Sequence, residues 1–306
     1  MYLLSREDYE KAQGYIFSEG RPLEQARLLH MTKGDHSTEV MKALTSYQNP
    51  DGGFGGGIEP DFRLPNSSPL ATSVALQVLV EHDDDEEAQQ MIIKALRYLE
   101  QTFDQKRQGW FAVPEEVNDY PHAFWWEVHE DGKSWIDANW GNPSAEIIGY
   151  LLKYEEKVHE LDVEKLTQQS LQHLMSLSDF ASEHELYCYL RFFELHPDRM
   201  DEGIQRKLKE GVRQTMVSDP EQWGNYVPTP LKFQPSPASV DLEVPKEDVV
   251  KNLEAVIQNL TNRPYVSPTW EWNQYEESWN QAKIEWQGIL TLESLKWLIN
   301  YKRIQS

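Results

Sequence analysis

Residues 48–57 read QNPDGGFGGG, a glycine-rich stretch between two helix-like segments. Before it, apolar residues recur at helical spacing at Val40, Met41, Leu44 and Tyr47. After it, residues 69–79 (PLATSVALQVL) are apolar on nearly every face, which is typical of a helix buried on all sides. Because glycine takes positive φ without steric cost, the stretch predicts a tight turn that passes close to a neighbouring segment.

Weaker copies of this stretch follow along the chain. Residues 105–111 (QKRQGWF) repeat the order of glutamine, polar spacer, glycine and aromatic residue, and residues 222–225 (QWGN) and 140–143 (WGNP) are fragments of it. Three of these turns lead into segments that begin with a proline followed by small residues, at Pro69, Pro143 and Pro237. Proline at the first helical position starts a helix sharply. Since the intervals are unequal, we expect a degenerate repeat with long functional loops.

The stretch 48–57, followed by Leu70 and Ala71 at the head of an alanine-rich helix, resembles the repeat of protein prenyltransferase β subunits. It is also similar to the Gln-to-aromatic repeats of squalene and hopene cyclases. The resemblance implies an all-α fold, an α/α toroid in which helical hairpins form a ring around an apolar cavity, with aromatic-rich loops at one rim. It is close over about thirty residues, and a motif of this kind indicates fold more than activity.

Two features depart from that resemblance. No Asp-x-Asp-Asp motif of the cyclases stands on a predicted inner helix, and no aspartate lies two residues before Cys188, as the zinc pattern of the prenyltransferases requires. His184 and Cys188 are four residues apart and share a helix face, as in half of a zinc site. A buried cysteine is ordinarily a small hydrophobic residue, so we expect no metal and no cofactor.

Apolar periodicity predicts eleven helices and almost no strands. The expected helices are residues 6–17, 23–31, 37–47, 69–81, 87–103, 143–156, 163–177, 182–195, 201–217, 246–260 and 284–301. No linker, composition shift or low-complexity tract divides the chain, so the sequence predicts a single domain over residues 1–306.

The formal net charge is −22, from 51 Asp and Glu against 29 Lys and Arg. Such a surface repels phosphate backbones and anionic bilayers, so we expect no nucleic-acid partner and no membrane binding. No run of eighteen apolar residues and no secretory signal is present, and Cys188 is the only cysteine. These features indicate a cytoplasmic protein.

Three long loops, residues 57–68, 108–142 and 218–284 apart from the helix expected at 246–260, are rich in aromatic and acidic residues, and loops of this length are usually functional. Nine of the eleven tryptophans lie in the last two loops. In a toroid they would gather at one mouth, where aromatic faces stabilise cations or stack on sugars, although such clusters also close cores. The candidate substrate-binding residues are Glu59, Arg63, Tyr120, Trp125, Trp126, Trp140, Trp223, Trp270, Trp272 and Trp286.

The candidate catalytic residues are Asp61, Glu146, Asp241 and His122. Asp61 follows the glycine stretch, where a rim turn would direct it into the mouth, and Glu146 lies in the first turn of an inner helix. A carboxylate facing a cavity is costly unless it is paired, so it is a candidate site residue. The alternative for the Glu59, Asp61 and Arg63 group is an internal ion pair that pins the loop.

The leading interpretation is a protein that binds a hydrophobic, isoprenoid-like small molecule in a Trp-lined cavity. If it is a cyclase, Asp61, Glu146 or Asp241 would supply the proton. The alternatives are a carbohydrate-active toroid with paired carboxylates and a non-catalytic toroid whose mouth holds a ligand or a protein partner.

Overall fold

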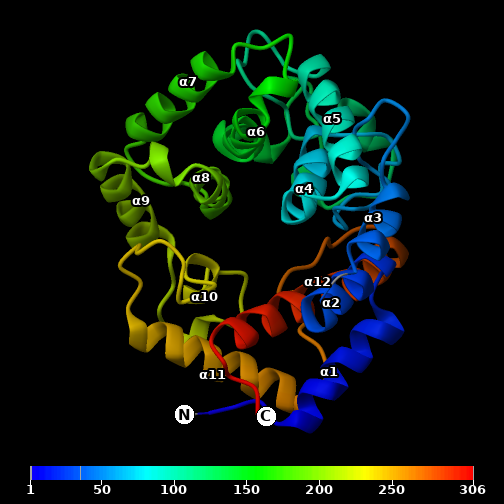
Figure 1. The fold of residues 1–306 in the computed structure, drawn as a ribbon, viewed down its shortest axis with the longest axis vertical. Helices are drawn as coiled ribbons and strands as arrows, with labels where there is room; N and C mark the ends of the chain where they lie inside the picture. The colour runs from blue at the N-terminus through cyan, green and yellow to red at the C-terminus, as the bar shows by residue number, and fades with distance from the viewer. Residues whose placement is uncertain (1, 35, 306) are drawn as a thin grey trace. The chain divides into compact units, whose positions relative to one another are not determined.

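The computed structural model describes residues 2–34 and 36–305, and this part of the chain is all-α, as the sequence predicts. It contains twelve α-helices and several short 3-10 turns, with isolated β-bridges but no strand (Figure 1). Two compact units divide the chain. The first unit comprises Met1–Ala43, Thr215–Glu271 and Glu276–Ser306, and the second comprises Leu44–Gln214 with the short segment Trp272–Tyr275. The single domain of the sequence analysis stays a prediction.

The first unit is built mainly from the two ends of the chain. Its helices are α1 (Arg6–Glu19), α2 (Pro22–Lys33), most of α3 (Ser37–Thr45), α10 (Pro230–Phe233), α11 (Lys246–Asn262) and α12 (Glu276–Asn300). Helix α1 packs against α2, α11 and α12, and α10 packs against α11. Ser5 caps α1, since its side chain accepts a hydrogen bond from the Asp8 N–H.

One hydrophobic core holds these helices of the first unit together. Its buried members include Ile16 from α1, Leu28 from α2, Leu253 from α11 and Leu295 from α12. The terminal segments add a backbone contact, because Leu4 N–H donates to the Arg303 carbonyl over 2.8 Å. The apolar stripes seen in the sequence therefore meet one another in a shared core.

The second unit contains the glycine-rich stretch and the aromatic loop that follows it. Its α-helices are α4 (Pro69–Leu79), α5 (Glu86–Gln101), α6 (Gly141–Lys153), α7 (Val163–Ser176), α8 (Glu183–Leu195) and α9 (Glu202–Thr215). Helix α6 packs against α4, α7 and α8, and α4 packs against α5 (Figure 1). Residues 141–151 of α6 are all buried, so neighbouring segments surround this helix on every side.

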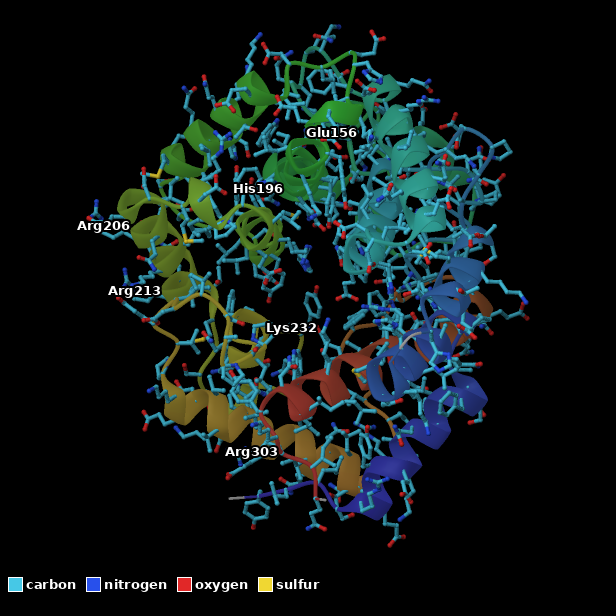
Figure 2. The ribbon with its side chains drawn as sticks, viewed as in Figure 1. Glu156, His196, Arg206, Arg213, Lys232 and Arg303 are labelled. Carbon is cyan, nitrogen blue, oxygen red and sulfur yellow. The ribbon has the colours of Figure 1, made fainter. Side chains whose placement is uncertain are left out.

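The peripheral helix α9 shows the opposite, amphipathic pattern. Ile204, Leu208 and Val212 are buried at a spacing of four residues. Arg206 and Arg213 are exposed and point away from the helix (Figure 2). The apolar stripe of α9 thus packs onto its unit, while the charged face meets solvent.

Three differences from the sequence analysis lie in the chain after residue 218. Helix α10 was not predicted, because four residues are too short to show periodicity. Helix α12 begins at Glu276, not at 284, because its first turns are polar and lack the apolar stripe on which the prediction relied. Pro237 lies in a turn and starts no helix.

The glycine-rich stretch forms the close turn that the sequence predicts; we call residues 48–57 the Gly52 turn. Gly52 has φ +92°, and a Cβ placed there would lie 2.5 Å from the Lys94 carbonyl oxygen of α5. At Gly55 a Cβ would lie 2.2 Å from the Asn66 carbonyl oxygen. Only glycine fits at these two positions, because any side chain would collide with backbone.

The second copy, residues 105–111, forms a related turn, which we call the Gly109 turn. In the Gly52 turn the Phe54 N–H donates to Thr72 Oγ1 at the start of α4, over 3.0 Å. In the Gly109 turn the Trp110 N–H donates to Ser144 Oγ at the start of α6, also over 3.0 Å. The repeat found in the sequence therefore has a structural counterpart in these two copies.

Candidate functional site

A buried cluster in the second unit joins two of the aromatic-rich loops. Phe62 and His122 form an isolated antiparallel bridge, the Ala123 N–H donates to the Asp61 carbonyl over 2.8 Å, and the Arg63 N–H donates to the Pro121 carbonyl over 2.8 Å. The loop after the Gly52 turn therefore runs beside the loop 108–142. Asp61 and His122 lie on the two paired backbone segments. Both side chains are only 4% exposed.

The segment Trp272–Tyr275 completes this cluster. Trp272 Nε1–H donates to Asp61 Oδ1 over 2.8 Å across 211 positions of the chain, and Gln274 Nε2–H donates to the His122 carbonyl over 2.7 Å. The Tyr275 ring lies 5.6 Å from the imidazole of His122, centroid to centroid. We call Asp61, Phe62, His122, Trp126, Trp272, Gln274 and Tyr275 the Asp61 cluster.

The backbone of Trp272–Tyr275 is held in an uncommon conformation. Asn273 has φ +57° and Tyr275 has φ +50°. Both lie in the left-handed region, which residues other than glycine seldom adopt. Such a conformation persists only when the surrounding contacts hold it, and the bonds of Trp272 and Gln274 supply those contacts. Strained backbone of this kind is concentrated at binding and catalytic sites.

The hydrogen bonds of His122 define its tautomer. Nδ1 lies 2.6 Å from the Tyr120 carbonyl oxygen, which can only accept, so Nδ1 carries the proton and donates. In the neutral ring, Nε2 then has a lone pair, and it forms no hydrogen bond with the part of the chain that the structure describes. Nε2 of His122 is thus a hydrogen-bond acceptor with no partner in the described chain.

Trp126 supplies the opposite group. Its ring packs edge-on against Phe62, with centroids 5.3 Å apart, and the residue is 5% exposed. Trp126 Nε1–H has no hydrogen-bond partner among residues 2–34 and 36–305. Leaving a buried donor unpaired costs about 1–3 kcal/mol. Phe62 thus adjoins both a buried donor and the residue that carries the acceptor.

Glu146 lies in a separate polar network between α4, α6 and α8. Its Oε1 accepts from Gln77 Nε2–H over 2.8 Å and from the Tyr150 hydroxyl over 2.6 Å. Arg191 Nε lies 2.8 Å from Glu146 Oε2, as an ion pair without hydrogen-bond geometry. Each oxygen of this buried carboxylate therefore has a partner, as a charge at that depth requires.

Burial and the Glu146 charge shift the pKa values of the neighbouring groups. Burial raises the pKa of Tyr150, and Glu146 raises it further. Burial alone would lower the pKa of Arg191, but Glu146, Cys188 and Tyr150 together raise it, so that pKa lies above its usual value. Burial also raises the pKa of the Cys188 thiol, which stays neutral. The arrangement fits a helix-pinning ion pair better than a proton donor.

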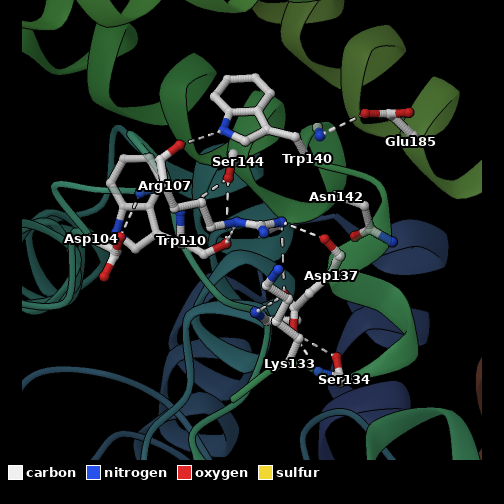
Figure 3. A network of polar contacts seen from close by, with 12 residues as sticks. Asp104, Arg107, Trp110, Lys133, Ser134, Asp137, Trp140, Asn142, Ser144 and Glu185 are labelled. Carbon is white, nitrogen blue, oxygen red and sulfur yellow. Dashed lines mark hydrogen bonds and ion pairs between the residues drawn. The ribbon is translucent and has the colours of Figure 1, made fainter. Parts of the chain in front are cut away.

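The Gly109 turn is fixed by a third network, centred on Arg107 (Figure 3). Arg107 donates through Nε to the Trp110 carbonyl and through Nη2 to the Asp137 carbonyl, each over 3.0 Å. Trp140 Nε1–H donates to the Arg107 carbonyl over 3.1 Å, and its ring lies 4.9 Å from that of His173. Burial lowers the pKa of Arg107, partly offset by Asp137. Trp140 thus helps to hold a turn.

Other candidates of the second unit lie at the edge of the Asp61 cluster. Glu59 Oε1 accepts from the Asp61 N–H over 3.4 Å, and Tyr120 contributes its carbonyl oxygen to His122. Trp125 is half-buried and meets Phe124 edge-on, with centroids 5.0 Å apart.

The first unit contains the remaining four candidates. Trp270 lies 5.0 Å from Trp286 and 5.3 Å from Tyr226, centroid to centroid, in two edge-on contacts. Trp223 Nε1–H donates to the Val217 carbonyl over 2.7 Å. Asp241 is exposed, and its carboxylate accepts from the Glu243 N–H in a local turn.

Three members of the Asp61 cluster were absent from the sequence-based candidates. Phe62 directly follows Asp61 in the sequence. It is a buried core residue, and the sequence analysis did not consider it for the site. Gln274 and Tyr275 closely follow Trp272, and only the long-range bond from Trp272 to Asp61 indicates their part in the cluster. A search for polar residues beside each candidate tryptophan would have found Gln274.

His184 and Cys188 do not form a common site. The His184 side chain is 43% exposed beside Glu183, whereas Cys188 is 2% exposed. Among the described residues, no group of three or more His, Cys, Asp and Glu side chains could hold a metal ion. Nor does any helix in this part of the chain have the length and apolar character needed to cross a membrane.

Comparison with known proteins returned no significant match, either to a family model, to a curated protein or to a solved structure. The function must therefore be argued from the residues of the chain itself.

Proposed function

We propose that this chain belongs to the terpenoid cyclase and prenyltransferase toroid class and binds a hydrophobic, isoprenoid-like small molecule. The observation that carries the proposal is the Asp61 cluster, in which a buried carboxylate, a histidine and several aromatic rings come together from three separate stretches. The shared contact of the Gly52 and Gly109 turns supports the repeat on which the class assignment depends.

The composition of the cluster favours a neutral ligand with an apolar body. Phe62, Trp126 and Tyr275 provide aromatic faces, and Asp61 disfavours an anionic group such as a diphosphate. In an acid-initiated cyclisation, the protonated form of Asp61 would be the proton source and these rings would stabilise the carbocation. Glu146 has no part in this step, since Gln77, Tyr150 and Arg191 engage its carboxylate.

Native mass spectrometry of protein purified from its own host tests the proposal directly. We expect a retained neutral molecule, and we expect calorimetric titration with isoprenoid alcohols and hydrocarbons to give micromolar binding. Replacing Phe62 with alanine should weaken that binding at least about tenfold, because it removes an aromatic wall. Phe124→Ala, at an exposed ring, is the matched control.

A specific result would contradict the proposal. If neutral oligosaccharides bind and no isoprenoid does, the carbohydrate-active alternative is supported instead. Asp61→Asn then separates binding from chemistry, because asparagine still accepts from Trp272 but cannot donate a carboxyl proton.

A further inference from the structure

We propose that the Asp61 cluster holds the hydroxyl group of an alcohol that has an apolar body. This inference rests on the proposed function and narrows the ligand to one chemical class. It is carried by two unpartnered polar groups of opposite kind, Nε2 of His122 and Nε1–H of Trp126.

The two groups differ in what they require of a ligand. His122 Nε2 must accept, because Nδ1 is committed as the donor to the Tyr120 carbonyl. Trp126 Nε1–H must donate, because an indole nitrogen has no lone pair to offer. A hydroxyl group carries both complements, a proton for an acceptor such as Nε2 and an oxygen for a donor such as the indole N–H.

Other ligand groups meet these requirements less well. An olefin satisfies neither group, and an ether oxygen could accept from Trp126 but has no proton for His122. A carboxylate or phosphate would be repelled by the carboxylate of Asp61, which directly precedes the bridged residue Phe62 and is itself 4% exposed. The hydroxyl group is therefore the simplest match to the cluster.

The surroundings are consistent with an apolar body beyond that hydroxyl. The Phe62 ring contacts that of Trp126, and the Phe62 backbone pairs with that of His122, so the cluster contains an aromatic ring next to the indole donor. The Tyr275 ring is tilted against the imidazole with centroids 5.6 Å apart, and Tyr275 is 46% exposed, so this side of the cluster reaches the surface. The positive φ of Tyr275 marks the segment Trp272–Tyr275 as strained.

Three related probes test the inference on the intact chain by calorimetry: geraniol, its methyl ether and the hydrocarbon myrcene. We expect geraniol to bind about tenfold more tightly than the ether, since the ether leaves His122 Nε2 unpaired. Trp126→Phe should weaken geraniol binding about five- to twentyfold and leave myrcene binding unchanged, because it removes one donor and keeps a ring. Trp135→Phe, at an indole 62% exposed, is the matched control.

A second measurement does not depend on a variant. Nitrogen-15 NMR of the unmodified protein should show the Trp126 indole N–H proton moving downfield on addition of geraniol, together with a shift of His122 Nε2. Myrcene should leave both resonances near their starting positions.

The possible outcomes separate this inference from the proposed function. Equal affinity for geraniol and its ether, or an unmoved Trp126 indole resonance, would overturn the inference while myrcene binding still supported the proposed function. If none of the three probes binds, both fail. If methyl glucoside binds in place of geraniol, with the same dependence on Trp126, the inference that the alcohol has an apolar body is wrong.

Discussion

The Gly52 and Gly109 turns share a contact that residues 222–225, the Gly224 fragment, do not make. In the two turns, the aromatic residue after the glycine donates its backbone N–H to a hydroxyl at the start of the following helix. In the Gly224 fragment, the Trp223 N–H instead donates to the Pro220 carbonyl of its own 3-10 turn.

This difference shows that the residue types of the motif are not sufficient to form the contact. Thr72 and Ser144 stand on helices that begin beside the turn, so their hydroxyl groups can reach the aromatic N–H. The counterpart segment at Pro237 forms a turn, and no helix presents Ser239 in the same way. A repeat of this kind needs both the glycine turn and the helix that receives it.

The largest expected effect comes from the aromatic residue of the motif. Trp110 is fully buried, and its Nε1–H donates to the Leu99 carbonyl over 2.7 Å, whereas Trp223 is half-buried. Trp110→Ala should lower the free energy of unfolding by about 3–5 kcal/mol, and Trp223→Ala by about 1 kcal/mol. Urea unfolding followed by far-UV circular dichroism measures both. Equal losses would remove the distinction between the two regions.

The glycines should differ nearly as strongly. Gly55→Ala would place a methyl group against the Asn66 and Pro65 carbonyl oxygens, at a cost of about 2–3 kcal/mol. Gly224 has open space around it, so Gly224→Ala should stay within about 0.5 kcal/mol of the parent chain. The same unfolding experiment compares them, and a harmless Gly55→Ala would mean that the turn can shift.

Removing the receiving hydroxyl groups tests the shared contact itself. Thr72→Val and Ser144→Ala each leave a buried backbone N–H unpaired and should cost about 1–2 kcal/mol. Ser239→Ala is the control from the third segment and should change little. Amide hydrogen exchange gives a local readout. Exchange at Phe54 should become faster only in Thr72→Val, and exchange at Trp110 only in Ser144→Ala.

The smallest effect concerns pH and the Gly52 turn alone. Burial raises the pKa of Tyr98, which packs beside Gly53, and Asp51 and Glu116 raise it further. A raised pKa in the folded state means that the stabilisation is complete below the unfolded pKa and is lost as pH rises above it. Between pH 9 and pH 11 this loss should be about 1 kcal/mol.

Tyr98→Phe isolates that contribution, because phenylalanine keeps the ring and has no ionisable hydroxyl group. The variant should lose less stability than the parent chain over the same pH range in urea titrations. An identical pH dependence in the two proteins would show that Tyr98 ionises as easily folded as unfolded.

Most helices could be predicted from the sequence, because each apolar stripe is a local pattern. Helix α7, for example, begins at Val163 as expected, behind an Asp162 cap. The start of α12 was wrong by eight residues, since its polar first turns show no stripe and tertiary packing alone extends it. The proline and small residues at Pro237 wrongly suggested a helix start. The local pattern was present, but no helix forms there.

The candidate site was predictable only as separate residues. Asp61, His122, Trp126 and Trp272 were each chosen for residue type and position in a loop, and the structure brings these four together. Their pairing could not be foreseen, since nothing local relates residue 61 to residue 272. Glu146 was chosen by the same reasoning, and only its contact with Arg191 reveals an internal ion pair.

The sequence by itself determined the all-α class, the glycine turn and the acidic character of this protein, because backbone preference, periodicity and charge act over a few residues at a time. Only the tertiary structure decided which carboxylate meets an indole and which meets a guanidinium. The bond from Trp272 to Asp61 joins segments 211 residues apart, and such a contact depends on how the whole second unit packs. Local chemistry therefore selected the candidates, and packing assembled them into a site.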